Sequence, residues 1–172
     1  MRISVNLSVR QVQQPNLRTT LEGVLDETGL ARRRLELEIS ESAARQNFDV
    51  TAPVLRDLAG VGIGISIDDF GAGHSLPGYP EGLPIRRLKI DRSLVTGIER
   101  EPRDTGTVRR IIQMAHSHGH RVVAEGVETR IELDVLRELE CDEFQGWVFS
   151  EALPEEGFER LLAASNPLFW TA

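Results

Sequence analysis

The sequence predicts an α/β fold in which short strands alternate with helices around a parallel sheet. Three observations predict it. Six segments alternate apolar with other residues at the period of two that is typical of strands. Segments with helical periodicity or capping signals separate them. The chain has 172 residues and is 40 % hydrophobic, which fits a packed core, so we expect one domain over residues 1–172.

The central strand is the most distinctive of the six. Ile63, Ile65 and Ile67 alternate with small or polar residues, and the strand ends in the adjacent carboxylates of Asp68 and Asp69. Unpaired acids are costly to bury, so we expect both at an open strand end within reach of a cation. The other five expected strands span residues 3–7, 35–39, 87–91, 121–126 and 143–149.

Helices are expected between these strands. The first spans Leu17–Thr28, with Asn16 as its N-cap and Gly29 as its stop. The most strongly amphipathic one covers residues 107–117. The remaining three are expected at residues 54–58, 131–139 and 157–164.

Composition excludes several classes of partner. A formal net charge of -7 and an isoelectric point near 5.2 argue against a protein that binds nucleic-acid polymers or anionic membranes. No apolar run reaches the length of a membrane span. The single cysteine, Cys141, cannot form an internal disulfide, which favours a reducing compartment and a cytoplasmic location.

Each of the six strands carries a polar or charged residue near its C-terminal end, opposite the aliphatic face. This pattern favours a (β/α)8 TIM-type barrel over a doubly wound sheet, because active sites of the barrel lie where these ends converge. A Rossmann-type sheet would instead need a glycine-rich loop after its first strand, and none is present. The six residues are Asn6, Glu38, Asp68, Lys89, Glu125 and Gln145.

The expected site is rich in oxygen donors. Hard ligands of this kind favour Mg²⁺ or Mn²⁺, and several carboxylates allow two adjacent ions, as in phosphodiester hydrolysis. Lys89 is the one expected cation and holds an attacking hydroxide, neutralises a phosphate oxygen, or only balances charge. Gln145 is a neutral amide that positions water. The five candidate metal ligands are Asn6, Glu38, Asp68, Asp69 and Glu125.

Six motifs, in order and at matching spacing, resemble those of the EAL domain across essentially the whole chain. The order and spacing of the set are far more specific than any one motif. The motifs are Ser4-Val-Asn-Leu-Ser8, Leu35-Glu-Leu-Glu-Ile-Ser-Glu41, Asp68-Asp-Phe-Gly-Ala-Gly73, Leu88-Lys-Ile-Asp91, Val123-Ala-Glu-Gly-Val-Glu-Thr129 and Gln145-Gly146.

The resemblance implies a fold, a reaction and residue roles. EAL domains are (β/α)8-type barrels that hydrolyse cyclic di-GMP to linear pGpG with Mg²⁺ or Mn²⁺. The five oxygen donors correspond to metal-site residues of the family, with Glu125 also counted as catalytic. Lys89 corresponds to the lysine beside the attacking water and Gln145 to a glutamine near that water. Glu128 corresponds to a glutamate that anchors the loop after the aspartate pair.

Three departures from the family pattern qualify this expectation. The Glu-Ala-Leu motif should lie upstream of Ser4, so the domain is expected to lack its first two strands and to hold about six of eight βα units. Open edges of this kind predict homo-oligomerisation, strand exchange or support from further domains. Prolines in residues 74–84 disfavour the family's short helix. Glu151-Ala152 stands where the family usually has a basic residue and proline.

The leading expectation is therefore a cyclic di-GMP phosphodiesterase, with activity impaired if the missing strands are required. The first alternative is a receptor that binds the nucleotide without turnover. The second is a module that uses an open barrel edge to dimerise. His116, His118 and His120 scatter around a helix end and are not expected to bind metal.

Overall fold

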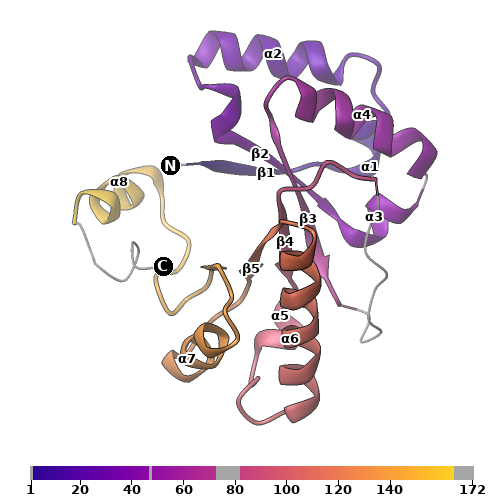
Figure 1. Cartoon of the computed structure of the whole chain (residues 1–172). Coiled ribbons are helices and arrows are strands. Elements are labelled where there is room, and N and C mark those ends of the chain that lie inside the picture. Colours follow the sequence, from indigo (N-terminus) through magenta and orange to yellow (C-terminus); the bar gives the residue numbers. More distant parts are fainter. Residues whose placement is uncertain (1, 47, 73–81, 165–172) are drawn as a thin grey trace.

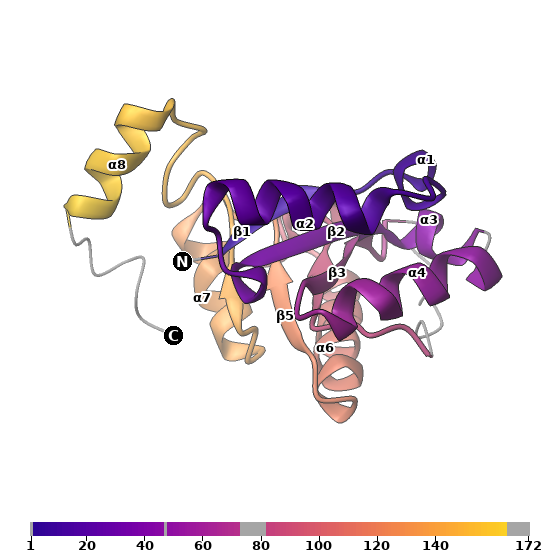
Figure 2. The ribbon, with the colours of Figure 1, turned by 90° about the horizontal axis from the view of Figure 1, so that it is seen from above.

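The computed structural model describes residues 2–46, 48–72 and 82–164 and contains one parallel sheet of six strands. The strands follow one another in sequence order, and each neighbouring pair is parallel. A doubly wound sheet would reverse its strand order partway, whereas a barrel keeps it. The sheet curls, with helices along its outer side, as the side view and the view from above show (Figure 1, Figure 2).

Five of the six strands lie close to where the sequence placed them, and the sixth is shorter. We expected a strand over residues 143–149, but the chain leaves the sheet after Phe144. The backbone N–H of Val148 donates instead to the carbonyl oxygen of Val127 at 3.0 Å, so this segment folds against the loop after the fifth strand. The strands are β1 (Ile3–Asn6), β2 (Leu35–Ser40), β3 (Gly64–Phe70), β4 (Arg87–Ile90), β5 (Arg121–Ala124) and β6 (Glu143–Phe144).

The five expected helices are present, and two of them begin several residues before the expected start. One begins at Phe48 and includes Pro53, which lacks a backbone N–H. The other begins at Pro102, at the position in the first turn where proline is tolerated. These helices are α2 (Leu17–Thr28), α4 (Phe48–Gly60), α6 (Pro102–Ser117), α7 (Arg130–Glu138) and α8 (Glu155–Ala163). Within the described residues, none of the helices combines the length and the apolar composition needed to cross a membrane.

Three short helices follow strands directly and were not expected, because four or five residues are too few to show a helical period. Side-chain oxygens of Ser8, Ser40 and Asp91 cap them by accepting backbone N–H groups of the first turn. They are α1 (Val9–Val12), α3 (Glu41–Arg45) and α5 (Arg92–Val95), and a 3₁₀ turn, Arg32–Arg34, precedes β2.

The hydrophobic core lies between the outer face of the sheet and the helices. Leu37, Ile65 and Leu88 belong to the aliphatic stripe on this face and are at most 2 % exposed. They pack with buried helix residues such as Leu55 and Ile111 into one cluster. Because side chains alternate along a strand, this packing directs the polar residues of the same strands into the barrel lumen.

The edge strand β1 is exposed along its length. Ile3 and Val5 lie in register with Leu35 and Leu37 of β2, yet they are 42 % and 46 % exposed. Helix α8 lies apart from the other helices, on the side where β1 begins (Figure 1, Figure 2). Most of the loop expected to lack a helix, residues 73–81, lies outside the described residues.

Candidate metal centre

Lys89 lies at the centre of an acidic cluster where the strands end. Its Nζ atom is 2.6 Å from Oε2 of Glu38, 2.7 Å from Oε1 of Glu125 and 3.2 Å from Oδ1 of Asp68. These four side chains come from β2, β3, β4 and the residue after β5. The strands therefore bring together four of the residues that the alternating pattern selected.

Lys89 keeps its charge in this setting. Only 5 % of the residue is exposed, and burial alone would lower the pKa of its ammonium group. Hydrogen bonds to Glu125 and Glu38 outweigh that penalty and raise the pKa above the ordinary value of lysine. An ammonium group held in this way donates hydrogen bonds to the surrounding acids and balances part of their charge.

A β-bulge places both aspartates at the mouth of the barrel. Ile67 pairs with Leu88 but Phe70 pairs with Ile90, so β3 contains one more residue than β4 over this stretch. Asp69 adopts the left-handed backbone conformation with a φ of 55°, which is rare for residues other than glycine. Adjacent residues of a regular strand would face opposite sides, and the bulge removes that restriction.

The carboxylates of Asp68, Asp69 and Glu125 converge. Each offers an oxygen, and these atoms lie within 4.8 Å of one another. Burial, with the charges of Asp68 and Asp91, raises the pKa of Asp69. Burial also raises the pKa of Glu125 to about 7, against the opposing effect of Lys89 and with a further contribution from Asp68. The single ammonium therefore leaves the acids incompletely neutralised.

The cluster fits a divalent cation. Oδ1 of Asp68 is buried and lies 3.2 Å from Nζ of Lys89, but it accepts no hydrogen bond from the described residues. A buried anionic oxygen without a hydrogen bond is costly, and a metal ion would satisfy it. The donors that converge are all oxygen, the ligand type of hard divalent cations.

Asn6, another residue selected from the sequence, borders this cluster. It ends β1 opposite Glu38 of β2, and it lines a hollow together with Glu38, Asp68 and Asp69. Asn6 is exposed and outside the group of three converging carboxylates. The structure thus places its amide beside the acids without assigning it a contact.

Gln145 and Glu128 lie on the other side of Glu125. Together with Asp69 and Glu125 they line a larger hollow that faces the segment after β6. The backbone of Gln145 is held by two hydrogen bonds, from its N–H to Ala124 O and from Val127 N–H to its own carbonyl. Neither side chain makes a hydrogen bond or ion pair with the part of the chain that the structure describes.

The loop after the aspartate pair is held by Glu41. Oε2 of Glu41, in the first turn of α3, accepts a hydrogen bond of 3.2 Å from the backbone N–H of Gly71. The resemblance assigned this role to Glu128, whose side chain is exposed and whose backbone N–H donates to Glu132. Most of the loop, residues 73–81, lies outside the described residues, so the role of Glu128 stays a prediction. The available signal was the second acid of the Glu38-Ile-Ser-Glu41 motif, which directly follows the strand that carries the first.

Gly146 follows Gln145 and touches the backbone of the preceding loop. A Cβ atom at this position would lie 2.2 Å from the carbonyl oxygen of Val127 and 2.3 Å from its nitrogen. No side chain fits at such distances, so only glycine permits this approach. The contact fixes Gln145 next to the loop that carries Glu125.

The three histidines have contacts of their own, away from the acidic cluster. Nε2 of His116 lies 2.8 Å from Oδ2 of Asp142, and the rings of His118 and His120 are stacked with centroids 6.3 Å apart. The group of metal-type ligands found within residues 2–46, 48–72 and 82–164 contains none of them.

The sequence of this chain is similar to those of known proteins. Residues 1–152 match the family model described as EAL domain. The cyclic di-GMP phosphodiesterase NbdA of Pseudomonas aeruginosa is 40 % identical over 164 residues, which cover 95 % of this chain and 21 % of NbdA. The chain spans about a fifth of the length of the curated relatives it matches.

Solved structures agree with the fold. The EAL domain of Mycobacterium smegmatis DcpA superposes with a TM-score of 0.89 at 34 % identity, covering 96 % of this chain and 74 % of that one. Klebsiella pneumoniae BlrP1, in a complex with manganese and cyclic di-GMP, gives 0.81 at 30 % identity, covering 87 % of this chain and 38 % of BlrP1. The expected incomplete barrel is confirmed by these matches.

Proposed function

This chain belongs to the EAL domain family, and on that premise we propose that it hydrolyses cyclic di-GMP to linear pGpG. The observation that carries the proposal is the convergence of Asp68, Asp69 and Glu125 beside the buried Lys89. The similarity to NbdA, a cyclic di-GMP phosphodiesterase, and the cyclic di-GMP in the BlrP1 complex support the choice of substrate.

We propose Mg²⁺ or Mn²⁺ as the cofactor, with one or two ions. The manganese in the BlrP1 complex and the oxygen-only donor set support this assignment. Such ions lower the pKa of bound water and offset charge on the attacked phosphate. The residues proposed to hold them are Asn6, Glu38, Asp68, Asp69 and Glu125.

The chain's own residues prepare the site in three ways. The Nζ atom of Lys89 donates hydrogen bonds at the centre of the cluster, and we propose that it orients the attacking water. Glu125 is proposed to bind the ion, and because its pKa lies at about 7 before a cation is present, the ion would displace a proton from it near neutral pH. The Gln145 amide, at the rim of the same hollow, positions water by hydrogen bonding.

We also propose that this chain has protein partners. The curated relatives are much longer than this chain, so we propose that it acts together with further domains or as a homo-oligomer. The exposed edge strand β1, with Ile3 and Val5 uncovered, supports an additional contact there. The same edge is the observation that favours the interaction module as the second candidate function.

A direct assay tests the proposal. The purified chain is incubated with cyclic di-GMP and Mn²⁺, and linear pGpG is measured by chromatography. We expect product that disappears with a chelator and in the Glu38→Ala variant, but persists in a matched surface variant, Glu22→Ala. Binding without product would indicate a receptor, and assembly without binding would indicate the interaction module. Unchanged turnover in Glu38→Ala would contradict the site assignment.

A further inference from the structure

We propose that Arg87 is a positioning residue for the metal centre, acting through Glu36 and Glu143 at the base of the barrel lumen. The inference rests on the proposed function, because it concerns the geometry of the site that would hold the ion. Arg87 lies on β4 two residues before Lys89. Neither its guanidinium nor its two glutamate partners belong to the residues proposed to contact metal or substrate.

The contacts of Arg87 cross the lumen. Its Nη1 atom donates to Oε2 of Glu36 on β2, and its Nε atom donates to Oε1 of Glu143 on β6 at 3.1 Å. Strand β3 separates β2 from β4, and β5 separates β4 from β6. One side chain therefore joins three strands that share no backbone hydrogen bonds.

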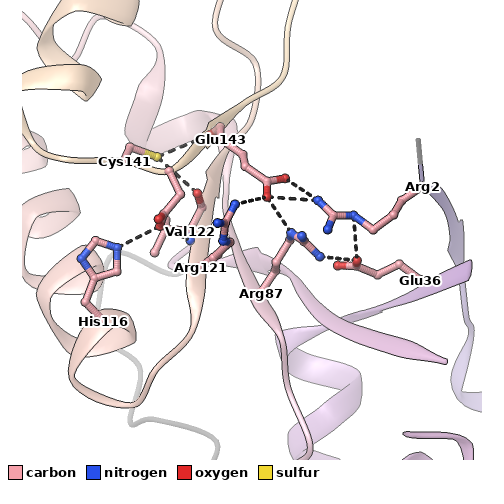
Figure 3. A network of polar contacts seen from close by, with 9 residues as sticks. Arg2, Glu36, Arg87, His116, Arg121, Val122, Cys141 and Glu143 are labelled. Atoms are coloured by element: carbon pink, nitrogen blue, oxygen red, sulfur yellow. Dashed lines mark hydrogen bonds and ion pairs between the residues drawn. The ribbon is translucent and has the colours of Figure 1, made fainter. Parts of the chain in front are cut away.

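Two arginines complete this group, which we call the lower tier: Arg2, Glu36, Arg87, Arg121 and Glu143. Nη2 of Arg2 lies 3.2 Å from Oε1 of Glu143, and Nη1 of Arg121 lies 3.5 Å from the same atom. Figure 3 shows the guanidinium groups of Arg2, Arg87 and Arg121 gathered around the Glu143 carboxylate. Glu36 lies beside Arg2 and Arg87 and contacts both. Arg2 precedes β1, so the tier also links the two edges of the sheet.

The lower tier contains an acid–base contact like one in the metal centre, one pleat further from the mouth of the barrel. Arg87 contacts Glu36, and two residues further along the same strands Lys89 contacts Glu38. Glu143 lies on β6, and Gln145 follows the end of that strand. Side chains two residues apart on a strand share a face, so Glu36 lies below Glu38 and Arg87 lies below Lys89 in the lumen.

Burial makes a purely stabilising role a poor explanation. Glu36 is 3 % exposed and Arg87 is 6 % exposed. Burying such a pair costs desolvation, and apolar residues of similar volume often stabilise a protein equally well. A planar guanidinium that bridges two carboxylates does supply fixed distances and angles between them. Here it sets the spacing of β2, β4 and β6, and hence of the acids and amide above.

The test removes the buried Glu36–Arg87 pair without leaving an unpaired buried charge. The double variant Glu36→Gln/Arg87→Met keeps Glu143 paired with Arg2 and Arg121. The dissociation constant for Mn²⁺ is measured by calorimetry on the full chain, together with thermal unfolding. A stability control, Leu136→Ala, truncates a buried core residue of α7 away from the lumen.

We expect the double variant to bind Mn²⁺ about tenfold more weakly, the size of effect typical of residues that orient metal ligands. The Leu136→Ala variant should bind Mn²⁺ as the parent does, even where it unfolds at a lower temperature. Equal Mn²⁺ affinity in the parent and the folded double variant would overturn the inference while leaving the proposed function intact. A parent chain that binds no Mn²⁺ would overturn both.

Discussion

The carboxylate of Glu41 and the backbone of Gly71 are joined by a hydrogen bond of 3.2 Å, which connects the start of α3 to the loop that follows the aspartate pair. The other oxygen of Glu41 accepts from Arg45 at 2.8 Å, so the carboxylate is held from both sides. Asp69 precedes this loop in a strained left-handed conformation that its surroundings must maintain. Glu41 supplies part of that restraint.

Removing this restraint should weaken metal binding. We expect Glu41→Ala to raise the dissociation constant for Mn²⁺ about tenfold, since the aspartates lose a support outside the site. Glu41→Gln is the matched control, because its amide oxygen still accepts from Gly71. Calorimetric titration with Mn²⁺ measures both. Equal affinities in the alanine and glutamine variants would show that the hydrogen bond does not position the aspartates.

A second prediction concerns Lys89. Replacing it with methionine leaves Glu38, Asp68 and Glu125 without their shared cation, and breaking a buried ion pair in this way costs about 3–5 kcal/mol. The metal-free Lys89→Met variant should therefore unfold at lower urea concentration than the parent. Added Mn²⁺ should stabilise the variant more than the parent, because the ion replaces the lost charge.

Urea titrations with and without Mn²⁺ provide the comparison. Glu99 pairs with Arg100 at the surface, so Arg100→Met is a control for loss of an exposed cation and should change stability by less than about 1 kcal/mol. An identical Mn²⁺ effect on Lys89→Met and parent would contradict the view that the ammonium and the metal share the same acids.

Gly146 gives a prediction about packing. Alanine at this position would place its methyl group 2.2 Å from the carbonyl oxygen of Val127, so the two backbone segments must separate. Overpacking of this kind costs about 1–3 kcal/mol. The matched control is Gly106→Ala in α6, where no atom lies within 4 Å of the new group. That helix-interior change should stabilise by about 0.5–1 kcal/mol.

The free energy of unfolding from urea titrations distinguishes the two glycines. A Gly146→Ala protein as stable as the parent would show that the loop after β6 moves without cost. A loss of stability in Gly146→Ala with a gain in Gly106→Ala would instead assign Gly146 a steric role. That role is to fix the backbone of Gln145 against the loop that carries Glu125.

The alternating pattern of apolar residues was enough to predict which side chains gather around Lys89. Alternation fixes the face of each side chain, and parallel strands bring their ends together, so Glu38 and Glu125 needed no further information. The bulge at Asp69 was not predictable in this way, because it depends on the register between β3 and β4. The Glu41 contact depends on where a five-residue helix points its first turn, and so few residues show no period.

The segment after β6 shows a different limit of sequence reasoning. Residues 145–149 have the composition of a strand, but the close approach of Gly146 to Val127 draws them out of the sheet. Tertiary contacts override local propensity there. No local pattern in the sequence distinguishes these residues from a strand that continues.

The last prediction concerns pH and Glu132, the third residue of α7. Its carboxylate is buried, and it accepts backbone N–H groups from Gly97, Glu128 and Thr129 at 2.9 Å each. Burial by itself would raise the pKa of Glu132, but these hydrogen bonds outweigh it and lower the pKa below the ordinary value of glutamate. The charged form is therefore favoured more in the folded state than in the unfolded state. The resulting stability is fully present above the ordinary pKa of about 4.3 and is lost as pH falls through the lower folded pKa.

In the Glu132→Gln variant the side-chain oxygen can still accept hydrogen bonds, but the charge that strengthens them is absent. We expect the variant to be less stable than the parent by about 1–2 kcal/mol at pH 7. That difference should shrink as the pH is lowered from 5 towards 3, because the parent then loses the same charge. Urea titrations at several pH values measure the difference directly. A gap between parent and variant that stays constant over this range would mean that Glu132 titrates normally in the folded protein, and that its hydrogen bonds to the start of α7 do not favour the carboxylate.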